Sequence, residues 1–152
     1  MPKDVLSALL PRKTQIYAAE AFAILAAMYE HLEDLRKTDA IFFVDNEAAC
    51  AAMIRGSSKE PDVSAIVNTV HWLLYQVDCR PWFEWVDSCS NCSDGLSRDG
   101  LTDEWTIAQR WNIKKGVVPP WNAVTECSRV ALKTLDLEDG GEEKEKKRWN
   151  GG

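Results

Sequence analysis

The sequence predicts an α/β domain in which two parallel central strands pack against helices. Two short apolar runs, at 40–44 and 81–86, are rich in the β-branched and aromatic residues typical of strands. Segments with helical spacing of apolar residues precede and separate these runs. Strands that alternate with helices pair in parallel, because the chain has to cross back between them. The length of 152 residues suits one domain with a real core.

The first long helix is predicted at Thr14 to Tyr29, a stretch rich in alanine that lacks glycine and proline. Glu20 is the only charged residue in this stretch. A lone carboxylate on an apolar helix is costly unless it is paired or lies at a site that requires charge. The apolar residues that recur at helical spacing form the expected core face: Ala18, Phe22, Leu25, Tyr29 and Leu32.

The first strand is expected at Ala40 to Val44, a continuous apolar run that suits a strand buried on both faces. Asp45-Asn46 ends the strand, and a helix follows from Glu47 to Arg55 with Gly56 as its C′ residue. Asp62 is then the expected N-cap of a helix that runs to about Gln76. The expected buried side of this helix holds Val63, Ile66, Val67, Val70 and Leu74.

The second strand is expected at Pro81 to Val86, and the polar loop Asp87 to Asp94 follows it. A turn of helix at 95–100, a helix at 103–111 capped by Thr102, and a weak helix at 124–135 come next. The expected organisation is therefore an N-terminal segment (1–13), the α/β domain (14–116), an irregular extension (117–137) and a disordered charged tail (138–152).

Composition narrows the class of protein. The net charge of −6 argues against a stand-alone basic nucleic-acid-binding module. It argues less against a metal nuclease, whose bound cations offset an acidic site. No run of about 18 apolar residues and no signal peptide is seen, so we expect an intracellular protein, cytoplasmic or nuclear, without a membrane partner. The five cysteines, with only Cys89 and Cys92 closely spaced, predict reduced thiols and no zinc site.

Three acids are placed where a site would form. Asp45 and Asp94 follow the two strands, and parallel strands end at the same edge of a sheet. Glu20 joins them if its helix packs across that edge. Converging carboxylates suit Mg²⁺ or Mn²⁺, and two such ions support phosphodiester hydrolysis. Each acid also has a plain structural interpretation, as a solvated helix residue (Glu20), a helix N-cap (Asp45) or a turn residue (Asp94).

Three segments resemble the ribonuclease H-like domain of retroelement (LTR-type) reverse transcriptases. They read QIYAAEAFAILAAM, FFVDNEAACAAMIRG and WFEWVDSCSNCSDGLSR. They carry a helix with Ile-x-x-x-Glu, a strand that ends in Asp-Asn before alanines, and a loop of the form N-x-x-D-x-x-S-R. The order and spacing fit the family, and the resemblance covers about residues 10 to 100.

The resemblance implies a hydrolase that cleaves RNA in RNA–DNA hybrids with Mg²⁺ or Mn²⁺. It assigns the catalytic and metal-binding roles to Glu20, Asp45 and Asp94. The residues expected beside them, to contact substrate or brace the loop, are Asn46, Asn91, Ser97 and Arg98. The implied partners are a hybrid or other nucleic acid and the rest of a reverse transcriptase polyprotein.

The chain departs from this family at its N-terminus. There, the family has a three-strand antiparallel meander whose first strand carries another catalytic Asp. Only 19 residues precede Glu20, they do not alternate like strands, and Asp4 is the only Asp among them. The family also often has a His before its last Asp, where Ser88 to Ser90 offer none. We therefore expect a partial, N-terminally truncated ribonuclease H-like fold with little or no cleavage.

Two alternatives stay open: an active hybrid nuclease, and an unrelated, catalytically dead α/β interaction module. In a sheet that lacks the first strand, Ile41 to Val44 form an uncovered apolar edge. Such an edge is a template for strand addition. We expect self-association through it, or coverage by Val5 to Leu10 or by the rest of a polyprotein.

Overall fold

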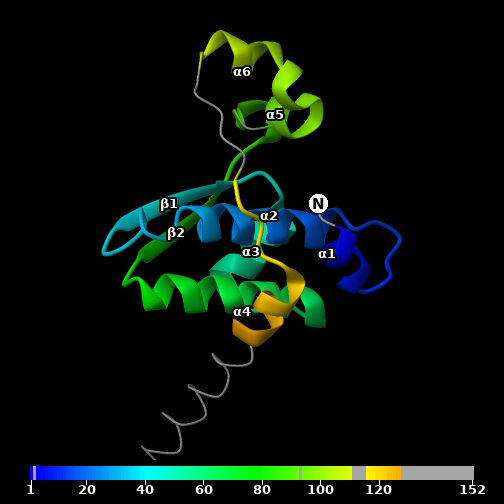
Figure 1. The fold of residues 1–152 in the computed structure, drawn as a ribbon, viewed down its shortest axis with the longest axis vertical. Helices are drawn as coiled ribbons and strands as arrows, with labels where there is room; N and C mark the ends of the chain where they lie inside the picture. The colour runs from blue at the N-terminus through cyan, green and yellow to red at the C-terminus, as the bar shows by residue number, and fades with distance from the viewer. Residues whose placement is uncertain (2, 93, 111–115, 128–152) are drawn as a thin grey trace, which may run out of the picture.

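The computed structural model describes residue 1 and residues 3–92, 94–110 and 116–127, without the side chains of residues 94, 97 and 98. The order of elements alternates helices and strands (Figure 1). In chain order they are α1 (Lys3–Ala8), α2 (Ile16–Glu30), β1 (Asp39–Val44), α3 (Glu47–Arg55), α4 (Pro61–Gln76), β2 (Arg80–Trp85), η1 (Ser88–Ser90), α5 (Asp94–Asp99), η2 (Gly100–Thr102) and α6 (Glu104–Ala108). The predicted α/β class is confirmed.

The two strands pair in parallel, as predicted. Ile41 lies opposite Trp82, and Val44 lies opposite Trp85. The crossover between the strands consists of α3 and α4, which contact each other. The C-terminal ends of both strands therefore lie side by side at one end of the sheet, and α5 and α6 lie beyond that end (Figure 1).

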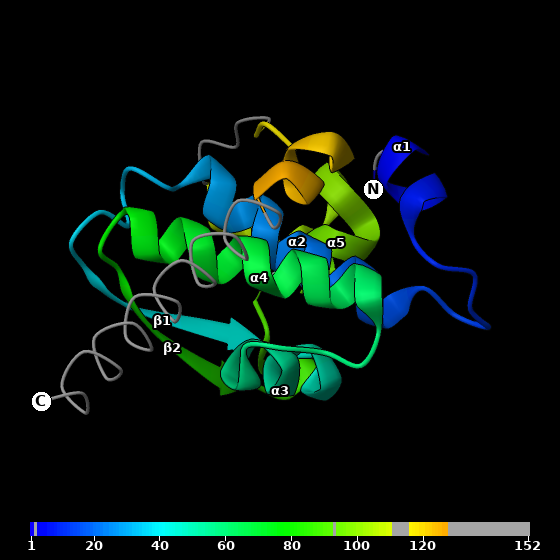
Figure 2. The same cartoon turned by 90° about the horizontal axis from the view of Figure 1, so that it is seen from below.

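The core lies between α2 and α4, which run side by side (Figure 2). All five residues predicted for the buried side of α4 are buried. On α2, Ala18, Phe22 and Leu25 are buried as predicted, but Tyr29 is 40% exposed and Met28 takes the core position. The reason is the helical period of 3.6 residues, which allows either the third or the fourth residue after Leu25 to face the core.

Only one face of the sheet is covered by helices in the described part of the chain. On the covered face Phe42 and Phe83 stack with ring centroids 5.3 Å apart, and Phe83 also meets the His71 ring of α4. On the other face Ile41, Phe43 and Trp82 are 62%, 66% and 64% exposed. The prediction of a strand buried on both faces is therefore wrong, because an unbroken apolar run does not say how many faces are covered.

The N-terminal segment packs into the core as helix α1. Val5 and Leu9 are buried, and the backbone N–H of Leu10 donates to Asp62 Oδ2 at 2.9 Å. Arg12 forms an ion pair with the same carboxylate. The expectation that Val5 to Leu10 cover the free edge of β1 is wrong, because this segment forms a helix held at the start of α4.

The sequence had suggested Asp62 as the N-cap of α4, but the structure shows that it is not. The helix begins at Pro61, and Glu60 occupies the N-cap position without a side-chain hydrogen bond. Burial acts to raise the pKa of Asp62. Hydrogen bonds from Arg12 and from the backbone N–H groups of Leu10 and Val63 outweigh burial and lower that pKa. Asp62 thus joins the N-terminal segment to α4.

The C-terminal part adds short helices. Asp103, rather than Thr102, caps α6, since its Oδ2 accepts from the Thr106 N–H at 2.7 Å. Residues 121–127 are helical and pack on α4, where Thr69 Oγ1 donates to the Val124 carbonyl at 2.9 Å. The rest of the predicted 124–135 helix and the predicted tail at 138–152 lie outside the described residues. No helix in the described ranges combines the length and apolar composition that a membrane crossing requires.

Candidate functional site

The candidate site lies where the two parallel strands end. Asp45 follows β1 directly, and the N–H of Val86 donates to the Val44 carbonyl at 3.1 Å, which continues the ladder one residue past β2. The polar segments that leave the strands, 45–46 and 87–91, therefore start side by side. Sequence reasoning anticipated this arrangement from the parallel pairing.

The loop after β2 is held in a tight turn by Asp87. The Asp87 carboxylate accepts from the Cys89 N–H at 2.8 Å, and the N–H of Asn91 donates to the Ser88 carbonyl at 3.2 Å. This turn directs Asn91 back toward β1, and Asn91 Nδ2 donates to Asp45 Oδ2 at 2.8 Å. The hydrogen bond joins the two strand ends that the sequence had assigned to one site.

Asp45 does not cap the helix that follows it. Asn46 is the N-cap of α3, since its Oδ1 accepts from the Ala49 N–H at 2.9 Å. The Asp45 carboxylate is only partly buried, and Asn91 is its partner among the described residues. The plain interpretation of Asp45 as an N-cap is therefore wrong, and Asn46 is the residue that caps α3.

Glu20 lies in the second turn of α2 and is half-buried. Helix α2 packs against α3, the helix that Asp45 precedes. A half-buried carboxylate at this position differs from the freely solvated helix residue of the plain interpretation. The structure thus places Glu20 on a helix that contacts α3.

Asp94 is the first residue of α5, which leaves the same edge of the sheet. The side chains of Asp94, Ser97 and Arg98 lie outside the described part of the structure. Their predicted roles therefore stay predictions. Within α5, Gly95 lies so close to Asp103 that a Cβ there would overlap the Asp103 carboxylate, so α5 packs tightly on the cap of α6.

The donor chemistry of the described residues suits a hard cation only in part. Asp45 offers a carboxylate at the sheet edge, and carboxylate oxygens are ligands that Mg²⁺ prefers. Among the described side chains, however, no group of three His, Cys, Asp or Glu residues is arranged to hold a metal ion. A metal centre at this edge would therefore need Asp94 as well as Asp45 and Glu20.

A second polar site, at the segment that joins α3 to α4, went unnoticed in the sequence. Arg55 and Lys59 line a cavity there, together with Tyr17 of α2. Tyr17 precedes Glu20 by three residues, which is about one helical turn. The only sequence feature that could have indicated this site is a pair of cations, Arg55 and Lys59, on either side of Ser57-Ser58. Such a pattern is common in solvated loops and therefore does not indicate a binding site by itself.

Comparisons with protein-family models, with curated proteins and with solved structures find no match to this chain.

Proposed function

We propose that this chain is a ribonuclease H-like domain of retroelement origin that binds Mg²⁺ or Mn²⁺ weakly and cleaves RNA–DNA hybrids little or not at all. Its metal ligands in this proposal are Glu20, Asp45 and Asp94. The bound ion would supply Lewis-acid activation of water for phosphodiester hydrolysis. Its macromolecular partners are a hybrid or other nucleic acid and the rest of a reverse transcriptase polyprotein.

The observation that carries the proposal is the hydrogen bond from Asn91 to Asp45. It links the loop that holds the N-x-x-D-x-x-S-R sequence to the residue that ends β1. These are two of the three segments that resemble the family. Parallel pairing brings the two strand ends together, and the Asn91–Asp45 hydrogen bond adds a side-chain contact between residues that the resemblance assigns to one site.

Asn91 has a definite task in this proposal. By donating to Oδ2, it holds the Asp45 carboxylate in one orientation. An oriented, ionised carboxylate is what a cation needs from its ligand. Asn46 contributes by fixing the first turn of α3, and this turn sets the direction in which Asp45 leaves the strand.

Weak activity follows from the ligand set. The described residues before α2 contain α1 and no strand, and Asp4 is exposed on α1. The proposal therefore has three carboxylates where the family has four. A two-ion site that lacks a bridging carboxylate keeps negative charge but loses the geometry that positions the second ion.

The test is degradation of a labelled RNA–DNA hybrid in Mn²⁺. Wild type is compared with Asp45→Asn and with Asp34→Asn. Asp34 is a control because it precedes β1 in the sequence and its side chain is 82% exposed. We expect cleavage barely above background, lost in Asp45→Asn and kept in Asp34→Asn. Robust turnover that Asp45→Asn abolishes would contradict the assignment of weak activity. Cleavage clearly above background that is equal in all three proteins would contradict the site.

A second candidate function is that of an interaction module, favoured by the exposed apolar face of the sheet. Ile41, Phe43 and Trp82 are each more than half exposed on that face. The free edge of β2 carries Pro81, which has no N–H to offer a further strand, whereas the free edge of β1 carries no proline. We propose that β1 pairs with β1 of a second copy of this chain.

A further inference from the structure

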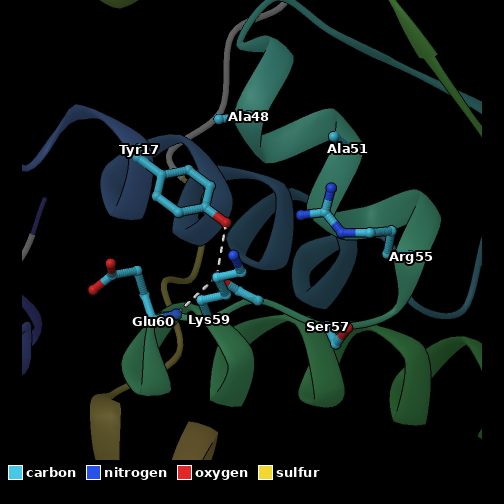
Figure 3. Close-up of a pocket in the computed structure, with 8 residues that line it drawn as sticks. Tyr17, Ala48, Ala51, Arg55, Ser57, Lys59 and Glu60 are labelled. Carbon is cyan, nitrogen blue, oxygen red and sulfur yellow. Dashed lines mark hydrogen bonds between the residues drawn. The ribbon is translucent and has the colours of Figure 1, made fainter.

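The structure holds a cavity of about 670 Å³ between α2, α3 and the segment that joins α3 to α4 (Figure 3). Ala48 and Ala51 of α3 form one wall, and Tyr17 of α2 faces them. Ligand sites for small molecules typically measure roughly 300–1,000 Å³. The cavity is therefore large enough for a small organic molecule, and it is distinct from the Asp45 site.

Two cations of this cavity have no anionic partner in the described part of the chain. Arg55 and Lys59 line the cavity and form no ion pair with any described residue. Glu60 also lines it, but its carboxylate pairs with Arg12 at 3.2 Å. The cavity therefore carries net positive charge, although the whole chain has a net charge of −6.

Hydroxyl groups lie beside these cations. The Tyr17 hydroxyl and Ser58 Oγ share a hydrogen bond of 2.9 Å, and Ser58 Oγ accepts from the Glu60 N–H at 3.2 Å. These bonds fix the segment 58–60 against α2. Ser57, also in the cavity wall, is exposed and offers a further O–H. Figure 3 shows that the Arg55 guanidinium extends from α3 toward the side of the cavity that Tyr17 lines.

We propose that this cavity binds a phosphate ester of about the size of a mononucleotide. The planar guanidinium of Arg55 can donate two parallel N–H bonds to phosphate oxygens, and Lys59 adds a compact positive charge. The Ser57 hydroxyl donates to a third oxygen. A phosphate alone would leave most of the cavity unfilled. In this proposal the organic group of the ester packs against the small side chains of Ala48 and Ala51 and against the ring of Tyr17.

Phosphate fits better than a carboxylate for a reason of charge and geometry. A phosphate monoester carries a charge between −1.5 and −2 near neutral pH and presents three acceptor oxygens. Arg55, Lys59 and the nearby hydroxyls match both the charge and the number of acceptors. The ester comes either from a free nucleotide or from the end of a nucleic-acid strand, and the chemistry at the cavity is the same.

The test is a titration of the full chain with AMP, followed by two-dimensional NMR of backbone amides and by calorimetry. Inorganic phosphate and a short oligothymidylate with a 5′-phosphate are titrated in parallel. We compare wild type with Arg55→Gln and with Lys13→Gln, a control that removes one exposed positive charge outside the cavity wall. Asp45→Asn, which alters the proposed metal site, is included to separate the two proposals.

We expect AMP to shift the amides of Ser57, Ser58 and Tyr17 at submillimolar to millimolar concentration. Arg55→Gln should raise the dissociation constant about tenfold, which is typical for loss of a charge-assisted pair, while Lys13→Gln and Asp45→Asn leave it within about twofold. Tighter binding of the oligonucleotide assigns the ester to a strand, and tighter binding of AMP assigns it to a free nucleotide. The proposal is overturned if these amides do not shift, if Lys13→Gln weakens binding as much as Arg55→Gln, or if inorganic phosphate binds as tightly as AMP.

Discussion

Asn91 donates a hydrogen bond of 2.8 Å to Asp45 across 46 positions of the sequence. The bond crosses from the loop after β2 to the residue that ends β1. It is therefore the contact that turns two strand ends into one candidate site. Its loss should affect the loop more than the fold.

The first prediction concerns this bond. Asn91→Ala should lower the free energy of unfolding by only about 1 kcal/mol, because a partly exposed hydrogen bond contributes little net stability. Amide hydrogen exchange in the 87–92 loop should nevertheless quicken clearly. Ser90→Ala, in the same loop and exposed, is the control that should leave both quantities near those of wild type. Equal exchange in the two variants would show that Asn91 does not hold the loop.

The second prediction concerns the N-cap of α3. Asn46→Ala should lower the free energy of unfolding by about 1 kcal/mol, because the Ala49 N–H loses its acceptor. Asn46→Ser should remain close to wild type, since a serine hydroxyl also accepts at an N-cap. Urea denaturation measures both variants. If serine and alanine destabilise equally, capping is not what Asn46 contributes.

The third prediction concerns the ion pair between Arg12 and Asp62. The Asp62 side chain is 4% exposed, so Asp62→Asn leaves Arg12 without its buried partner. We expect a loss of about 2 kcal/mol in the free energy of unfolding, because Arg12 then keeps only the more exposed Glu60 as its anionic partner. Asp34→Asn, an exposed change of the same kind, should alter stability by less than about 0.5 kcal/mol. Chemical denaturation at neutral pH measures both variants.

The same pair predicts the direction of a pH dependence. The pKa of Asp62 is lowered in the folded chain. Its contribution to stability is therefore fully present above the unfolded pKa of about 4 and is lost as the pH falls through the lowered folded value. Stability measured in steps from neutral to acid pH should fall less steeply in Asp62→Asn than in wild type. Parallel curves would contradict the assignment.

The fourth prediction concerns pairing through the free edge of β1, beside which the exposed side chain of Phe43 lies. Wild type should form a dimer at micromolar concentration in size-exclusion chromatography with light scattering, because β1 has an unprotected edge. Phe43→Lys should shift the chain to a monomer. Tyr75→Lys is the matched control, since Tyr75 is 69% exposed on α4 and Phe43 is 66% exposed on β1. A wild-type monomer, or a dimer that both variants preserve, would rule out pairing through β1.

Local signals predicted much of the fold from the sequence. The bounds of α3, Glu47–Arg55, were predicted with Gly56 after its last residue, and Gly56 takes a φ of +71° there. The residue that caps the start is Asn46 and not Asp45, the possible N-cap in the sequence. The parallel pairing followed from the alternation of strands and helices. Both inferences depend on neighbouring residues only, and these are visible in the sequence.

Features that depend on distant residues were not predicted. Asp62 looked like an N-cap because its partner Arg12 lies 50 positions away. The exposed face of β1 was missed because five apolar residues in a row give no alternation from which to assign an inner face. The candidate site was predicted by family resemblance and strand order, and its supporting bond from Asn91 required the turn that Asp87 holds.

The central claim is that a divalent cation binds at the sheet edge beside Asp45. It is tested most directly by titrating Mn²⁺ into the isotopically labelled chain and measuring paramagnetic line broadening of backbone amides. The account predicts that the amides of Asp45, Asn91 and Glu20 broaden first, and that Asp45→Asn removes this preference while Asp34→Asn keeps it. Broadening that is uniform over the acidic surface, or that is unchanged in Asp45→Asn, would contradict the claim.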